Sequence, residues 1–162
     1  MIPRDRTRLR FVLRAALLLA AATVIAACGT ISRTPPAPTP ADFPGIAGVL
    51  TQHGIRVDPT RIVSGDAGCD DLNLAKTAIG FDASGLDQLT PVRIHVFIFR
   101  NRAAYERLRN TVDQCAASFV TDPETFESIE TSPYVVAGQG PWAPAFKDNL
   151  RAAFRKAAGT GN

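Results

Sequence analysis

The segment VRIHVFIF, residues 92–99, has the clearest strand pattern in the chain. Two sets of side chains alternate along it, one made of Val92, Ile94, Val96 and Ile98 and the other of Arg93, His95, Phe97 and Phe99. A two-residue period places these sets on opposite faces of a strand. The β-branched set is expected to face the core, because such side chains suit a buried pleated surface. This strand therefore predicts a sheet with an apolar face and a face that presents Arg93 and His95.

The segment after this strand has the period of an amphipathic helix. Asn101 is a favourable N-cap residue, and apolar side chains recur every three or four positions after it. These side chains are Tyr105, Leu108, Val112, Cys115 and Phe119. The spacing predicts a helix after Asn101 that places Cys115 on its buried side.

Further helices and strands are expected on both sides of this unit. The patterns predict a helix at residues 44–53, extended chain at 55–63 and a helix at 71–78 with Asp70 or Asp71 as its cap. Residues 77–82 are ambiguous between the end of that helix and a short edge strand.

The C-terminal third predicts one strand and one helix. The strand is expected at residues 129–138. The helix is expected to start after it, with Pro141 at the first helical position. Its apolar stripe is Trp142, Phe146, Leu150 and Phe154. A dinucleotide-binding loop at residues 138–143 is the weaker interpretation, because Pro141 removes a backbone donor that a pyrophosphate needs.

These elements are too few for a doubly wound sheet. We therefore predict an α+β fold at residues 43–162: a two-layer sandwich of three or four mostly antiparallel strands, with helices packed on one face. The order of elements resembles that of small envelope lipoprotein domains of uncharacterised function. That resemblance rests on pattern alone and implies no catalytic residue.

The amino terminus has the features of a signal peptide. An arginine-rich start ends at Arg14 and is followed by thirteen apolar or small residues, 15–27. As a helix this run would reach only about 20 Å, short of a hydrocarbon core of roughly 30 Å. Residues 1–27 are therefore predicted to be a signal peptide.

The run ends in Ile25-Ala26-Ala27-Cys28, which resembles the lipobox of bacterial lipoproteins. The resemblance implies cleavage before Cys28 and attachment of lipid to its sulfur. It places the protein at the cell membrane or outer membrane, facing out of the cytoplasm, with the membrane as a partner through the anchor. An ordinary secretory signal with an incidental cysteine is the alternative. Four prolines close together then predict an extended tether at residues 28–42.

The basic charge of the chain belongs to this leader. The chain has 18 basic and 15 acidic residues; the leader holds five arginines and one aspartate, which leaves 13 basic and 14 acidic residues in 28–162. No basic surface remains to displace counterions from phosphates, so we expect no nucleic-acid partner.

The other two cysteines, Cys69 and Cys115, are predicted to form a disulfide in an exported domain. Two buried thiols, or a zinc site with His53 and His95, are the alternatives. No spacing typical of zinc ligands is present, and we predict no metal.

No catalytic motif is found, so we predict no enzyme activity and no cofactor. The favoured hypothesis is a non-catalytic binding or interaction module with an envelope protein as its partner. The alternative is a small-ligand or metal-binding domain that uses the polar strand face around Arg93 and His95.

Overall fold

The computed structural model describes residues 42–159; the predicted signal peptide, Cys28 and almost all of the predicted tether lie outside them. Among the described residues the α-helices are α2 (Phe43–Gln52), α3 (Leu72–Ala75), α4 (Arg102–Ala116) and α5 (Pro144–Ala157). The strands are β1 (Arg56–Val57), β2 (Val63–Ser64), β3 (Ala78–Gly85), β4 (Gln88–Ile98), β5 (Phe126–Thr131) and β6 (Tyr134–Gln139). Two 3₁₀ turns are η2 (Pro59–Arg61) and η3 (Pro123–Thr125). The α+β class is confirmed.

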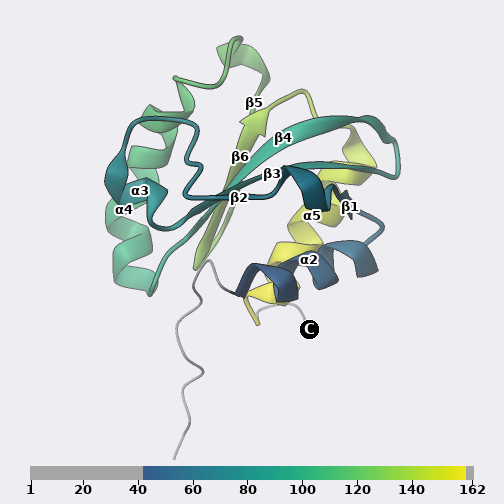
Figure 1. Ribbon diagram of the computed structural model, residues 1–162, viewed down its shortest axis with the longest axis horizontal. Coiled ribbons are helices and arrows are strands. Elements are labelled where there is room, and N and C mark those ends of the chain that lie inside the picture. Colours follow the sequence, from purple (N-terminus) through teal and green to yellow (C-terminus); the bar gives the residue numbers. More distant parts are fainter. Residues whose placement is uncertain (1–41, 160–162) are drawn as a thin grey trace, which may run out of the picture. The chain divides into compact units, whose positions relative to one another are not determined.

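Within residues 42–159, six strands form one antiparallel sheet in the order β1-β3-β4-β6-β5, and β2 also pairs with β3 (Figure 1). The prediction of three or four strands was too low. The strands β1 and β2 have two residues each, too few to show a period. The predicted strand at 129–138 is in fact the hairpin of β5 and β6, which turns at Ser132 and Pro133. Residues 78–82 of the ambiguous segment belong to β3, which lies inside the sheet between β1 and β4, and the helix predicted at 71–78 ends at Ala75.

The first face of the sheet is covered by α2 and α5 (Figure 1). Its core includes Ile94 and Val96 of β4, as predicted for the β-branched set. The helix residues Leu50, Phe146 and Leu150 are fully buried against it. This face therefore has the apolar core that the strand pattern predicts.

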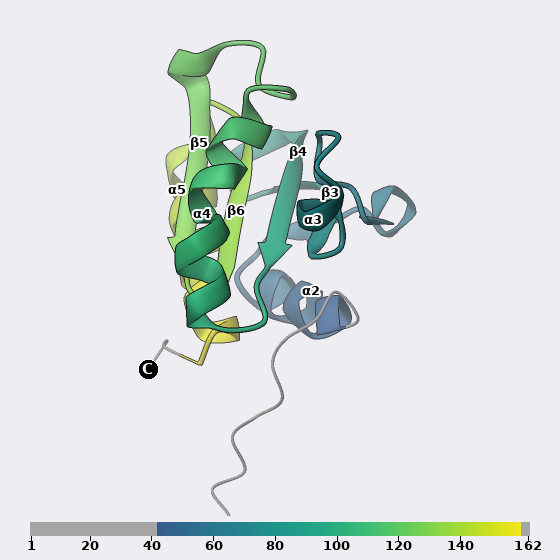
Figure 2. The ribbon, with the colours of Figure 1, turned by 90° about the vertical axis from the view of Figure 1, so that its left-hand side faces the viewer.

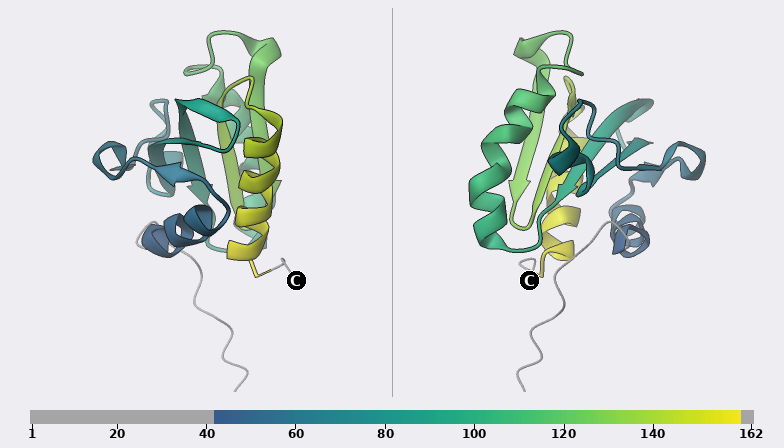
Figure 3. Two further views of the ribbon diagram at one scale, coloured as in Figure 1. Left: turned by 90° about the vertical axis from the view of Figure 1, so that its right-hand side faces the viewer. Right: turned by 60° about the vertical axis from the view of Figure 1, so that its left-hand side comes forward.

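The second face is also apolar and is covered by α3 and α4 (Figures 2 and 3). Phe97 of β4, Phe99 directly after that strand and Val135 of β6 are buried there. The prediction of helices on one face only was therefore wrong. Helices cover both faces because the central strands are apolar on both sides. A single layer of helices would leave large aromatic side chains in water.

Most predicted helix starts are confirmed, but that of α5 is not. Asn101 accepts a hydrogen bond from the N–H of Ala104 at 2.9 Å, and Asp71 caps α3. The helix α5 begins at Pro144 rather than beside Pro141, so Trp142 precedes it. Trp142 still packs in the first-face core.

The predicted disulfide is present. Cys69 and Cys115 are bonded, with their Cα atoms 5.4 Å apart. The bond joins the segment before α3 to the buried side of α4. It leaves neither free thiols nor zinc ligands at these two positions.

Candidate functional site

The two residues predicted to form a ligand face, Arg93 and His95, lie next to each other on the second face of β4. The Arg93 guanidinium donates through Nη1 to Asp82 Oδ1 at 3.0 Å and to the carbonyl of Arg61 at 2.8 Å. Its Nη2 donates to Asp66 Oδ2. Arg93 thus joins β3, η2 and the loop at residues 65–71 to β4.

His95 is buried, with 4% of its surface exposed. Its Nδ1 lies 3.2 Å from the carbonyl oxygen of Asp66, and its ring centroid lies 4.4 Å from that of Phe119, which follows α4. Burial lowers the pKa of His95 below its ordinary value, more than the Asp66 carbonyl and carboxylate raise it. The neutral imidazole is therefore the form that suits this environment.

Asp66 completes this network. Partial burial raises the pKa of its carboxyl, but hydrogen bonds from Arg93 and from the N–H of Gly68, together with the positive charge of Arg93, outweigh burial and hold this pKa below its ordinary value. The ion pair lies directly over Gly80, where a Cβ atom would be 2.2 Å from Asp66 Oδ2. Only glycine leaves room there.

These contacts assign Arg93 and His95 a structural role, because their polar atoms hold loop 65–71 against the sheet. A ligand role for them stays a prediction. In residues 42–159, no three His, Cys, Asp or Glu side chains come together as metal ligands.

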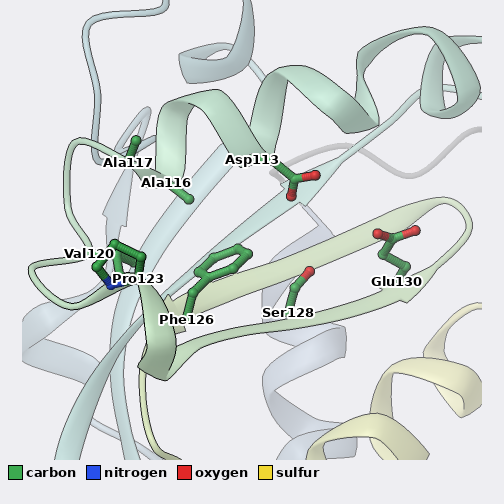
Figure 4. Close-up of a pocket in the computed structure, with 8 residues that line it drawn as sticks. All are labelled: Asp113, Ala116, Ala117, Val120, Pro123, Phe126, Ser128 and Glu130. Carbon is green, nitrogen blue, oxygen red and sulfur yellow. The ribbon is translucent and has the colours of Figure 1, made fainter.

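A different part of the second face is hollowed. A pocket of about 490 Å³ lies between α4 and the edge strand β5 (Figure 4). It is lined by Asp113, Ala116, Ala117, Val120, Pro123, Phe126, Ser128 and Glu130. Its volume is in the range that small ligands occupy, and most of its lining is apolar. We call it the α4–β5 pocket.

The strand period builds the floor of this pocket. Phe126, Ser128 and Glu130 alternate along β5, and Figure 4 shows their side chains on the side of the strand that faces α4. Between them, Ile129 faces the opposite way into the first-face core. The wall is the carboxyl-terminal half of α4 and the residue that caps it, where the small residues Ala116 and Ala117 leave space above β5.

Ser128 lines the pocket, whereas Arg109 lies on α4 outside its lining. The Ser128 hydroxyl and Arg109 Nε have no hydrogen-bond partner in the part of the chain that the structure describes. An unpaired buried polar group costs free energy, about 1–3 kcal/mol. A ligand or water that reaches the Ser128 hydroxyl would remove that cost.

Glu130 is held at one end of the pocket by two side chains of α4. Tyr105 donates its hydroxyl to Glu130 Oε2 at 3.2 Å, and Arg109 Nη2 lies 3.2 Å from Oε1. Burial and the nearby Glu130 carboxylate raise the pKa of Tyr105, so its hydroxyl remains a donor. Asp113, the other acid of the pocket, forms no ion pair within residues 42–159.

Sequence reasoning did not find this pocket. The alternation of Phe126, Ser128 and Glu130 is a usable signal, but the predicted strand begins at Ile129, three residues after β5 starts. Comparison of the chain with protein-family models, with curated proteins and with solved structures found no match. The function is therefore argued from the site itself.

Proposed function

We propose that this protein is a lipid-anchored, non-catalytic binding module of the cell envelope, and that its ligand site is the α4–β5 pocket. The leader and the lipobox ending at Cys28 support the anchor. The observation that carries the binding role is an apolar pocket of about 490 Å³ beside a buried hydroxyl, that of Ser128, which has no partner within residues 42–159.

The lining indicates the chemistry of the ligand. Ala116, Val120 and Phe126 suit an apolar group, and the Ser128 hydroxyl suits a hydrogen-bonding one. The two charged residues of the lining, Asp113 and Glu130, are both acids. Glu130 forms an ion pair with Arg109, whereas Asp113 forms none within residues 42–159. The pocket therefore favours an apolar group attached to a cation over one attached to an anion.

The Arg93 and His95 face supports binding less well. Arg93 already donates to two carboxylates and a carbonyl, and His95 is almost completely buried. A ligand there would have to displace these contacts.

The test compares two small molecules of the same shape. We expect 4-ethylbenzylamine, but not 4-ethylbenzoate, to bind the full chain in a neutral detergent, measured by ligand-observed NMR. Ala117→Trp, at the exposed end of the pocket wall, should block binding of the amine because the indole fills the pocket.

The matched control is Ala103→Trp: Ala103 is an exposed alanine near the start of α4, outside the pocket that Ala117 lines at the other end of that helix. Equal binding by the two tryptophan variants would contradict the proposed site. Binding of the benzoate as well as the amine would contradict the assigned charge preference.

A further inference from the structure

We infer that the ligand of this module is an extended peptide that adds as a strand to the free edge of β5 and places an apolar side chain in the α4–β5 pocket. The inference rests on the proposed binding function and names the class of partner. It joins two features that lie side by side, the sheet edge and the pocket.

The strand β5 ends the sheet. Within residues 42–159 it pairs only with β6, in continuous register from Phe126 opposite Gln139 to Thr131 opposite Tyr134. Figure 2 shows it as the outermost strand, beside α4. It has no proline and no bulge, two of the devices that commonly protect an exposed edge.

The hydrogen-bond pattern tells which backbone groups face outward. The N–H of Gly140 donates to the carbonyl of Thr125 at 2.7 Å, and these two residues are opposite each other when the register is extended by one pair. Hydrogen-bonded and non-hydrogen-bonded pairs alternate in an antiparallel ladder. The backbone N–H and C=O groups of Phe126, Ser128 and Glu130 therefore point away from β6, toward the free edge.

The same three residues supply the floor of the pocket. An added strand would pair with the backbone of Phe126, Ser128 and Glu130. The residue opposite Ser128 would then have its side chain on the same face of the sheet as the Ser128 side chain, the face on which the pocket opens. Backbone pairing and occupation of the pocket thus follow from one register, as in other cases of recognition by strand addition.

Charge selects the partner. Residues 121–131 contain four acids and no lysine or arginine; Glu127 pairs with Lys147 and Glu130 with Arg109. Asp122 and Glu124, together with Asp113 across the pocket, form no ion pair within residues 42–159 and leave a net negative charge beside this edge. A second copy of β5 would bring acidic side chains against acidic side chains, which disfavours self-pairing. The partner is therefore a peptide that combines apolar and basic residues.

The probe is the nonapeptide KTVTLTVTK with blocked ends, whose valines, leucine and lysines share one face of a strand. We expect it to bind the full chain in neutral detergent, measured by fluorescence anisotropy of a labelled peptide. The same peptide with glutamate in place of lysine should bind at least about tenfold more weakly, because its charge matches that of the site. Equal binding by the two peptides would overturn the assignment of a basic partner.

Methylation of backbone nitrogens tests strand addition directly. A strand pairs through the N–H groups of alternate residues. Methylating one alternate set, either the valines and leucine or the threonines, should abolish binding, and methylating the other set should leave it unchanged. An equal effect of both sets, or no effect of either, would overturn strand addition.

Two substitutions at Ser128 test strand addition by changing the protein instead of the peptide. Ser128→Pro removes one outward N–H that β6 does not use, so the sheet should tolerate it. It should weaken peptide binding about tenfold relative to Ser128→Ala, which also lacks the hydroxyl but keeps that N–H. Equal affinities of the two variants would overturn the inference. If Ser128→Pro does not fold, binding of the methylated peptides to the unaltered protein tests strand addition.

The outcomes separate this inference from the proposed function. Binding of 4-ethylbenzylamine without binding of the peptide would overturn strand addition and leave the pocket as a small-ligand site. Binding of neither would overturn both. If the unaltered protein sediments as a dimer and Ser128→Pro sediments as a monomer, a second copy of the chain occupies the edge of β5. That result would overturn the peptide partner.

Discussion

Oδ1 of Asp87 accepts a hydrogen bond from the backbone N–H of Phe146 at 2.8 Å, although the two residues are 59 positions apart. Its Oδ2 accepts from the N–H of Ala145 at 2.9 Å. Asp87 lies in the turn between β3 and β4, so this turn caps the first turn of α5 from outside the helix. The hydrogen bonds from Ala145 and Phe146 hold the pKa of this carboxyl below its ordinary value. The cap fixes the start of α5 over the first face of the sheet.

Asp87→Ala removes this cap. We expect it to lower the melting temperature by about 5 °C, because two N–H groups at the start of α5 lose their acceptor. Thermal unfolding followed by circular dichroism measures the change. Asp148→Ala is the matched control, since Asp148 makes only an exposed ion pair within the same helix. A change no larger than that of the control would show that water replaces the cap without cost.

Phe146→Ala tests the packing of α5 on the sheet. The side chain of Phe146 is fully buried in the first-face core, beside Trp142. Its truncation should lower the free energy of unfolding by about 3–5 kcal/mol, measured in urea. An unfolding curve unchanged by Phe146→Ala would contradict the packing described for α5.

The disulfide of Cys69 and Cys115 closes a loop with a sequence separation of 46. Replacing both cysteines by alanine should lower the free energy of unfolding by about 4 kcal/mol on the loop-entropy estimate. The reductant TCEP should lower the melting temperature of the unaltered protein and leave that of the double variant unchanged. Two thiols that react with iodoacetamide in the unreduced native protein would contradict the bond.

The buried His95 predicts a loss of stability in mild acid. Its pKa is lowered in the folded protein, so the unfolded chain takes up a proton first as the pH falls. The free energy of unfolding should be constant above about pH 6.5 and decrease below it, by at most about 1.4 kcal/mol per pH unit, until the folded protein also binds the proton. Urea unfolding between pH 5 and pH 8 measures this.

His95→Gln should be less stable at neutral pH but should lose this dependence between pH 5 and 6.5. The carboxylate of Asp66 adds its own loss only at lower pH, near and below the ordinary range of an aspartate. A dependence that persists unchanged in His95→Gln would assign it to another group.

The anchor prediction concerns Cys28. Cys28→Ala removes the sulfur that would carry the lipid, and we expect the variant to leave the detergent phase in a Triton X-114 partition in which the unaltered protein stays. Mass spectrometry of the mature amino terminus is the second measurement. A mature protein that begins at a residue other than Cys28 would contradict lipidation.

Local patterns predicted the elements whose signals lie within a few residues. The alternation at residues 92–99, the cap at Asn101 and the apolar stripe with Phe146 each arise from neighbouring positions on one strand or helix. The α+β class and a disulfide with Cys115 on the buried side of its helix followed from them. Two short strands were missed because two residues are too few to show a period. The turn at Ser132 and Pro133 has a usable signal, since Ser-Pro favours a turn, but the predicted strand at residues 129–138 runs through it.

The sequence by itself thus determined the strongest strand, the main helices and the bond between Cys69 and Cys115, and it predicts the lipid anchor at Cys28. Only the tertiary structure decided that helices cover both faces, that Arg93 and His95 are committed to Asp66, and that β5 and α4 enclose a pocket. The physical reason is that propensity and periodicity act over a few residues. A sheet edge, a pocket or a buried ion pair is instead made by segments brought together from distant parts of the chain.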